Sequence, residues 1–145
     1  PAVLEDVLQR FGTRAYLDVE LKVPGGEESV AAALRGNPPQ HSFTVSSFLP
    51  EGLLRLREID SDVPLGYICD REDALLLWRE LPINVFLPHY SLVHPDLIDE
   101  AHQRGLEIMS WTVNDTRHMR QLADWGIDGL ISDDPAGLYQ MFHSR

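Results

Sequence analysis

The stretch LEIMSWTVNDTRHMRQLADWGIDGLIS, residues 106–132, contains a strand, a helix and a second strand in succession. Its parts are a β-rich run at 106–113, a helical run at 116–125, Gly126 and a second β-rich run at 128–132. In the helical run, Met119, Leu122 and Ala123 recur at spacings of three and four, which is typical of one buried helix face. Gly126 follows the helix as a C-terminal cap should. This order predicts two parallel strands joined by a crossover helix.

The same unit recurs along the rest of the chain. We expect further strands at 15–21, 42–47, 65–69 and 83–87, and further helices at 27–35, 51–59, 72–81, 96–104 and 136–143. Six alternations fit an open doubly wound sheet or a (β/α) barrel. A complete barrel takes about 250 residues, so six units would be about three quarters of one. The 145 residues suffice for one core, and we expect a single domain over 1–145.

The composition excludes some classes of partner. The formal net charge is −11, which disfavours nucleic acid and anionic membrane surfaces. An anionic substrate would therefore need a local cation or a metal. The single cysteine, Cys69, has no partner for an internal disulfide and reads as a small buried residue. No membrane-spanning run or signal peptide is visible, and a chain that begins with Pro1 looks processed upstream; we expect a cytoplasmic location.

In parallel βα proteins, functional groups collect at the carboxyl ends of the strands. The first such end is AYLDVELK, residues 15–22, in which Asp18, Glu20 and Lys22 share one face at period two. Inside a barrel, a carboxylate and an ammonium so spaced could hold a divalent metal and an anionic oxygen side by side. The alternative is an edge strand with one solvated face, and the spacing alone favours that alternative.

The next strand ends offer polar and aromatic candidates. Ser46 and Ser47 could bind a ligand or cap the following helix, and capping is favoured. Phe48 could line a pocket or fill the core. His89 and Tyr90 follow the strand at 83–87, where a lone histidine is more often structural than functional.

The last two strand ends contain a tryptophan and several helix-capping residues. Trp111 could form an apolar wall for a ligand or belong to the core. Asn114 and Asp115 are predicted turn and N-cap residues, and Asp133 and Asp134 a predicted helix start. The other histidines are predicted helix-start, surface or loop residues, namely His94, His102, His118, His143 and His41.

Five motifs together resemble one enzyme family. They are LDVELK, TVSSF, PLGYI, AHQRGLEIMSWTVND and WGIDGLISDDP. Their order and spacing resemble the C-terminal part of the glycerophosphodiester phosphodiesterase family, over residues 3–138. WTVN followed by GIDGLISDDP at this distance is the most specific part of the resemblance.

The resemblance implies a fold, a reaction and three site residues. The fold would be an α/β TIM-type barrel, here an incomplete one of about six βα units. The reaction would be hydrolysis of a small-molecule glycerophosphodiester to glycerol 3-phosphate and an alcohol, with a divalent cation such as Ca²⁺ or Mg²⁺. By the family's motifs, Glu20 would bind the metal, Lys22 would contact the phosphate, and Trp111 would line the substrate pocket.

The chain also departs from the family pattern. The family's acid/base histidines lie in a His-Arg-Gly motif and a His-Asp motif, and further metal carboxylates lie in a Glu-x-Asp motif; none is present here. No catalytic histidine is therefore assigned. We expect the parent protein to be a phosphodiesterase and this chain alone to be inactive.

Two other readings remain open, and open sheet edges would favour self-association of the chain. One reading is a non-catalytic binding or assembly module derived from the barrel. The other is a different βα enzyme of phosphate chemistry, with Lys22 as its anion site.

Overall fold

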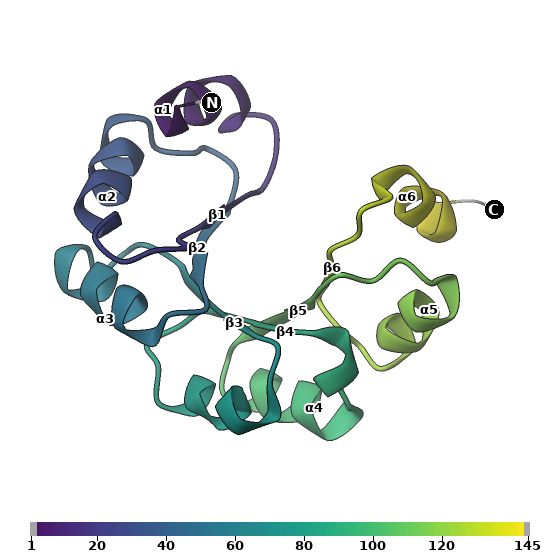
Figure 1. Cartoon of the computed structure of the whole chain (residues 1–145). Helices are drawn as coiled ribbons and strands as arrows, with labels where there is room; N and C mark the ends of the chain where they lie inside the picture. Colours follow the sequence, from purple (N-terminus) through teal and green to yellow (C-terminus); the bar gives the residue numbers. More distant parts are fainter. Residues whose placement is uncertain (1–2, 144–145) are drawn as a thin grey trace. The chain divides into compact units, whose positions relative to one another are not determined.

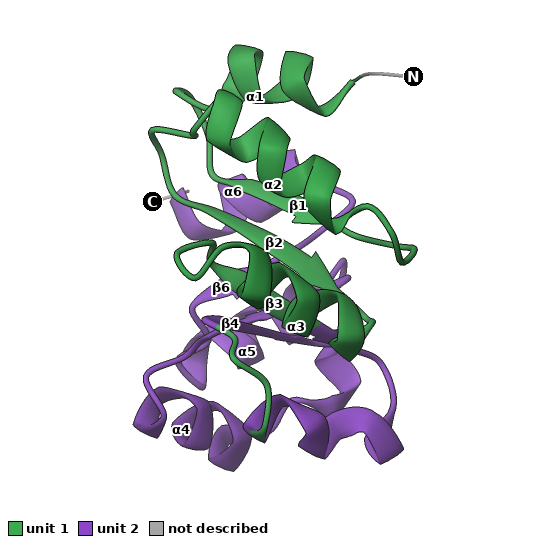
Figure 2. Ribbon diagram, turned by 90° about the vertical axis from the view of Figure 1, so that its left-hand side faces the viewer, with its two compact units in different colours: residues 1–67, 80–83 green, residues 68–79, 84–145 purple. Residues whose placement is uncertain are grey.

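The chain divides into two compact units, which are described separately below (Figure 2). The structure is a computed structural model that describes residues 3–143. Unit 1 comprises residues 1–67 and 80–83, and unit 2 comprises residues 68–79 and 84–145. The expectation of one domain over the whole chain stays a prediction.

Unit 1 consists of three helices and three parallel strands that alternate along the chain (Figure 1). Its elements are α1 (Leu4–Phe11), β1 (Leu17–Glu20), α2 (Glu27–Gly36), β2 (Phe43–Ser47), α3 (Pro50–Ile59) and the start of β3 (Leu65–Cys69). β1 pairs with β2 and β2 with β3, both in parallel. The strands predicted at 15–21, 42–47 and 65–69 are thus confirmed.

The core of unit 1 lies where α2 and α3 cover one face of its strands. Leu34, Val45, Leu53, Leu56 and Leu65 are all buried there. Full burial of such a side chain stabilises the fold by about 1.5–3 kcal/mol relative to its exposure. The face opposite this core is therefore free to carry polar residues.

Unit 2 continues the alternation with three further parallel strands. Its elements are the 3₁₀ helices η1 (Glu72–Arg79) and η2 (Tyr90–Leu92), the helices α4 (Pro95–Gln103), α5 (Thr116–Asp124) and α6 (Pro135–His143), and the strands β4 (Val85–Pro88), β5 (Glu107–Ser110) and β6 (Gly129–Leu130). β4 pairs with β5 and β5 with β6 in parallel. The three strands predicted here are confirmed, although β5 and β6 are shorter than expected.

The segment predicted as a helix at 72–81 differs from the other helices. It forms a 3₁₀ helix, and of its eight described residues Trp78 alone is buried. Leu76 and Leu77 are exposed by 58% and 43%, so no 3.6-residue apolar face stabilises an α-helix. Trp78 instead stacks on Phe86, with ring centroids 5.2 Å apart, and Arg104 lies over its ring.

The predicted capping residues lie at the helix ends of unit 2. His94 begins α4 and its ring accepts the backbone N–H of Leu97, and Asp115 accepts two backbone N–H groups at the start of α5. Gly105 and Gly126 follow α4 and α5 with φ of 75° and 89°, a left-handed conformation that favours glycine. These predictions are confirmed.

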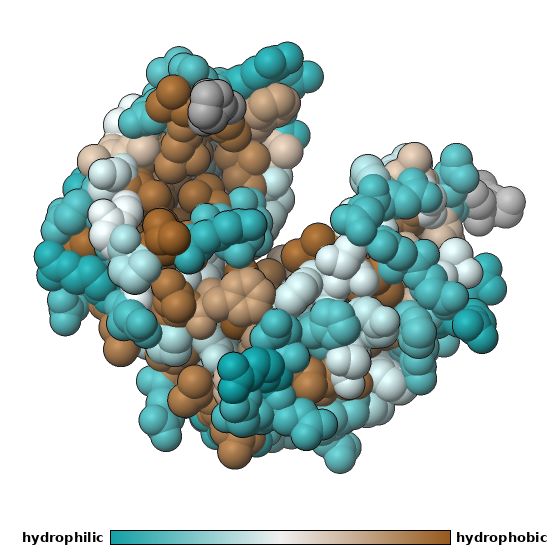
Figure 3. Space-filling view, in the orientation of Figure 1, coloured by the Kyte–Doolittle hydropathy of each residue, from teal (hydrophilic) through white to brown (hydrophobic). Residues whose placement is uncertain are grey.

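Several large apolar side chains of unit 1 are exposed. Val3, Phe11 and Tyr16 lie on or beside α1 with exposed fractions of 57%, 37% and 41%. Figure 3 shows apolar surface gathered over the part of unit 1 that holds α1 and α2. Among residues 3–143, no helix has the length and apolar character needed to cross a membrane.

Arg57 on α3 explains why residues 80–83 belong to unit 1. Its guanidinium donates to the carbonyl oxygens of Ser61, Val63 and Pro82, the last two at 3.0 and 2.9 Å. One half-buried side chain thus ties the loop before β3 and the segment before β4 to α3. A hydrogen bond to a charged group stabilises more than one between neutral groups.

Replacing Arg57 should loosen this junction. We expect Arg57→Met, which keeps the apolar stem, to lower the free energy of unfolding by roughly 1.5–3 kcal/mol, because three carbonyls lose a charged donor. Urea unfolding followed by circular dichroism measures the loss. Arg55→Met is the matched control, since Arg55 lies on the same helix and makes exposed ion pairs with Glu28 and Glu58. Equal losses in the two variants would contradict the role of Arg57.

Candidate functional site at the strand ends

Glu20 and Lys22 lie together at the carboxyl end of β1. The exposure of β1 alternates, with Leu17 and Val19 half-buried and Asp18 and Glu20 exposed. The Lys22 Nζ atom lies 3.5 Å from Glu20 Oε2, and the two side chains are exposed by 75% and 32%. A surface ion pair of this kind stabilises a fold by about 0–1 kcal/mol, so stability does not account for it.

The polar face of β1 continues onto β2. Glu20 lies opposite Ser46, and Asp18 lies opposite Thr44, so these side chains share one face of the sheet. The Thr44 hydroxyl forms a hydrogen bond with the Tyr16 hydroxyl. Ser46 is fully buried, and its hydroxyl is close enough to the Asp18 carboxyl to affect its pKa. The expected polar face is therefore present.

The two carboxylates of β1 influence each other electrostatically. The pKa of Asp18 is raised above its ordinary value, first because protein atoms around the carboxyl displace water and also because of the negative charge of Glu20. The nearby Ser46 hydroxyl partly offsets this rise in pKa. Asp18 has exposed surface as a residue, so we expect the effect of burial to be moderate. Like charges on one face favour a cation beside them.

A buried serine holds the backbone between Glu20 and Lys22. The Ser47 hydroxyl donates to the carbonyl oxygen of Leu21 at 2.7 Å and accepts the N–H of Leu49 at 3.0 Å. It links the end of β1 to the turn before α3. The prediction that Ser46 or Ser47 caps α3 is wrong, because the N-cap is Leu49 and no described side chain caps that helix. The N-cap position lies two residues beyond Ser47, so this serine is too early in the chain to occupy it.

A buried carboxylate closes the loop that follows Lys22. Glu27, at the start of α2, is 8% exposed and accepts the N–H of Gly25 at 2.9 Å. Gly25 has a φ of 92°, which glycine adopts without strain. Ser47 and Glu27 therefore fix the chain on both sides of Lys22, and the lysine side chain itself extends into solvent.

Trp111 belongs to unit 2 and follows β5. Its indole Nε1 donates to the carbonyl oxygen of Leu87 at 2.9 Å. Its ring packs against the buried cluster of Ile68, Val85 and Leu87, yet the residue stays half-buried. Both functions left open for this side chain, core packing and a wall for a ligand, are compatible with that position.

Asn114, predicted with Asp115 as a turn and N-cap residue, makes contacts that the sequence did not predict. Its Oδ1 accepts the Ser132 hydroxyl and the Asp133 N–H at 2.9 and 3.0 Å, and its Nδ2 donates to Asp133 at 2.9 Å. It therefore joins the loops after β5 and β6, while Asp115 caps α5. Asp134 accepts the N–H of Gly137 at 2.9 Å, as a helix start should.

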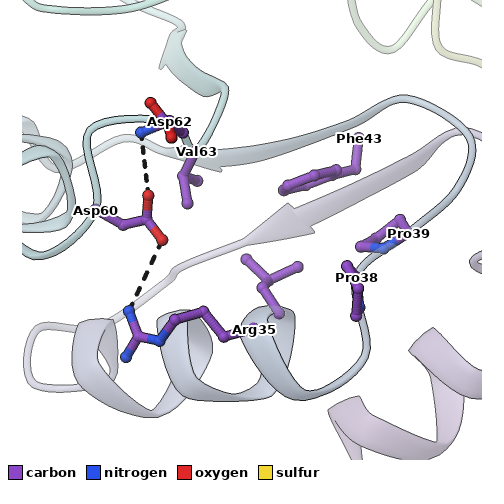
Figure 4. Close-up of a pocket in the computed structure, with 8 residues that line it drawn as sticks. Arg35, Pro38, Pro39, Phe43, Asp60, Asp62 and Val63 are labelled. Atoms are coloured by element: carbon purple, nitrogen blue, oxygen red, sulfur yellow. Dashed lines mark hydrogen bonds and ion pairs between the residues drawn. The ribbon is translucent and has the colours of Figure 1, made fainter.

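A pocket of about 250 Å³ in unit 1 is unrelated to these strand ends (Figure 4). It lies at the amino end of β2, opposite to Glu20 and Lys22. Its lining consists of Leu34, Arg35, Pro38, Pro39, Phe43, Asp60, Asp62 and Val63. Arg35 pairs with Asp60 at 3.7 Å across its rim. Sequence reading missed this pocket because its walls come from three separated segments.

The hydroxyl of Ser47 should be necessary for a stable β1 end. We expect Ser47→Ala to cost roughly 1–3 kcal/mol of unfolding free energy, because a buried carbonyl and a buried N–H lose their partner. Hydrogen exchange should accelerate at the Leu49 amide. Ser29→Ala, at an exposed position of α2, is the control. An unchanged exchange rate at Leu49 would refute the link.

Comparison with known proteins places the chain in a family. Residues 27–137 match the Glycerophosphoryl diester phosphodiesterase family. The glycerophosphodiester phosphodiesterase of Bacillus subtilis is 27% identical over 156 residues, covering 97% of this chain and 52% of that protein. The chain spans between 52% and 60% of the length of the curated relatives it matches.

Solved structures agree on the fold. The putative glycerophosphoryl diester phosphodiesterase of Silicibacter pomeroyi matches with a TM-score of 0.83 and 24% identity, over 95% of this chain and 55% of that one. An Oleispira antarctica phosphodiesterase in complex with the product sn-glycerol-3-phosphate matches at 0.80 and 22%, over 96% and 59%. The predicted class, a TIM-type barrel represented here by about six βα units, is confirmed. Because the family match covers most of its length, this chain belongs to the glycerophosphoryl diester phosphodiesterase family.

Proposed function

We propose that the protein to which this chain belongs hydrolyses glycerophosphodiesters to glycerol 3-phosphate and an alcohol. The observation that carries the proposal is the pair of Glu20 and Lys22 at the carboxyl end of β1. By the resemblance of LDVELK to the family's motif, these are the positions of a metal ligand and a phosphate contact. The relative from Oleispira antarctica, which has the same fold, was solved with the product sn-glycerol-3-phosphate.

Lys22 would hold the phosphate of the substrate. It is the only lysine in a sequence with a net charge of −11, and its side chain is 75% exposed. An ammonium acts as a point charge on phosphoryl oxygens and requires no fixed geometry. Its partner in the structure, Glu20, lies 3.5 Å away, so the ammonium can turn to a ligand without breaking a buried contact.

Glu20 would hold a divalent cation, Ca²⁺ or Mg²⁺. A carboxylate oxygen is the ligand type these cations prefer, and the second carboxylate on the same face, Asp18, favours positive charge there. Such a cation, when bound, would stabilise charge on the phosphoryl oxygens. No group of three or more His, Cys, Asp or Glu side chains able to hold a metal occurs among residues 3–143. This chain would thus supply one ligand of a set of about six.

Trp111 would provide the apolar wall against which the substrate rests. Its indole is oriented by the hydrogen bond to the Leu87 carbonyl and by the cluster beneath it. A ring held on one side by the core and half-exposed on the other offers a fixed surface at little entropic cost.

We also propose that the 145 residues alone do not turn over substrate. The histidine motifs that provide acid/base catalysis in the family are absent from the sequence. General acid–base catalysis typically contributes about 10²–10⁴-fold, and its loss would leave binding without efficient hydrolysis.

A non-catalytic binding or assembly role is the second candidate. It is favoured by the exposed apolar residues Val3, Phe11 and Tyr16 on unit 1. A concentration-dependent mass by sedimentation, abolished by Phe11→Glu, would support self-association; a monomer at all concentrations would exclude it.

The uniqueness of Lys22 allows a direct test of phosphate binding. We expect sn-glycerol 3-phosphate to protect Lys22 from an amine-reactive label, as measured by peptide mass spectrometry of the labelled chain. Lys22→Met should weaken binding of the same ligand by roughly tenfold or more, because a charged contact is lost. Arg55→Met, an exposed cation of α3, is the control. Full labelling of Lys22 at saturating ligand would contradict its role.

The role of Glu20 is tested by the effect of the cation. We expect Ca²⁺ or Mg²⁺ to raise the affinity of the wild-type chain for sn-glycerol 3-phosphate and to leave that of Glu20→Gln unchanged. Isothermal titration with and without EDTA measures both. Glu28→Gln, an exposed acid of α2, should behave as wild type. A Glu20→Gln variant that keeps the full response to the cation would remove Glu20 from the metal site.

A further inference from the structure

A row of aromatic rings lies at the carboxyl end of β4, next to Trp111. His89 follows β4 and forms an isolated parallel bridge with Trp111, which places both side chains on the same face. The His89 ring meets the Trp111 ring edge-on, with centroids 5.3 Å apart and an angle of 81°. The Tyr90 ring also packs on the His89 ring, with centroids 4.5 Å apart. His89 therefore borders the surface that Trp111 presents.

The hydrogen bonds of His89 determine which ring nitrogen carries its proton. The N–H of Ser91 points at Nδ1 of His89 at 3.3 Å, and the Ser91 hydroxyl lies 2.8 Å from the same atom. A nitrogen that accepts a backbone N–H is unprotonated, so the neutral ring carries its proton on Nε2. The tautomer is inferred from these contacts.

The Nε2–H group of His89 is left for a ligand. Among residues 3–143, every hydrogen bond of this ring involves Nδ1, and Nε2 has no partner. The residue is half-buried, and a ring N–H without a protein acceptor can donate to a ligand oxygen. The ring contacts of His89 with Tyr90 and Trp111 supply no hydrogen-bond acceptor for the Nε2 proton.

We propose that His89 is a ligand-binding residue, whose Nε2–H donates a hydrogen bond to an oxygen of the glycerol 3-phosphate moiety resting against Trp111. The proposal rests on the function proposed above for Trp111. In a chain with a net charge of −11, a neutral donor can hold an anionic or hydroxyl oxygen, and Ser91 keeps that donor oriented. The same contact could involve a phosphate oxygen or a glycerol hydroxyl, and the test separates them.

Two substitutions at His89 distinguish the role of Nε2 from the role of the rest of the ring. Asparagine places polar atoms near the position of Nδ1 and retains the local contact with Ser91, but has no group at the position of Nε2. Glutamine extends further and places an amide donor near the position of Nε2. A role in ligand binding predicts that the His89→Gln variant binds the ligand and that the His89→Asn variant binds it weakly.

The experiment is titration of the whole chain and its variants with sn-glycerol 3-phosphate, followed by calorimetry. We expect His89→Asn to weaken binding by roughly tenfold or more, the loss of one hydrogen bond to a charged ligand, and His89→Gln to stay close to wild type. The thermal midpoints of the two variants should agree. His41→Asn, in an exposed loop, is the matched control. Titrations with inorganic phosphate and with glycerol identify which oxygen His89 binds.

Each outcome decides for or against the proposal. Wild-type affinity in His89→Asn, with binding lost in Lys22→Met, overturns the role of His89 and leaves the proposed function standing. Equal losses in both His89 variants with lowered midpoints would show a structural role and overturn the proposal. Absence of binding of all three ligands by the wild-type chain overturns both. Suppose His89→Asn weakens binding of sn-glycerol 3-phosphate but the parent protein hydrolyses no glycerophosphodiester. That result supports ligand binding by His89 and contradicts the proposed function.

Discussion

Parallel pairing of neighbouring strands decides which side chains of this chain can act together. Because β1 and β2 run in the same direction with Glu20 opposite Ser46, their carboxyl ends lie side by side. The two-residue period then divides the strands into a face packed by helices and a face free of them. The packed face supplies stability through residues such as Val45 and Leu65, both fully buried. The other face carries Asp18 and Glu20, which a hydrophobic core would exclude.

Because the chain has a large negative net charge, a cation at a strand end is important for binding an anionic substrate. With a net charge of −11, the field of the protein repels an anionic substrate, and only short-range contacts can overcome that repulsion. Most arginines in the structure are engaged elsewhere; Arg57 binds carbonyl oxygens and Arg79 pairs with Glu100. Lys22 lies at the carboxyl end of β1, and its ion pair with Glu20 is exposed and exchangeable. A phosphate contact at this position is thus consistent with both its location and its freedom.

The sequence was sufficient for the order of elements but not for contacts across them. All six strands, the caps at His94 and Asp115 and the left-handed Gly105 and Gly126 follow from local patterns. The 3₁₀ form of η1 was missed because three consecutive leucines suggest a helix whatever they pack against. Ser47 binds Leu21, 26 residues away, and Asn114 binds Asp133, 19 residues away. Such pairs depend on strand register, which periodicity does not reveal.

The candidate residues of each unit combine a rigid support with an exposed or half-exposed side-chain group. Ser47 and Glu27 fix the backbone on either side of Lys22, whose ammonium remains in solvent. Trp111 is oriented by the Leu87 carbonyl and keeps an exposed part, and His89 is held through Nδ1. The rings of Trp111 and His89, held this way, lose little conformational entropy when a ligand binds, so more of their contact energy contributes to affinity. Stability alone requires neither an exposed ammonium at Lys22 nor a donor of His89 that faces no described acceptor, and ligand binding gives both a physical role.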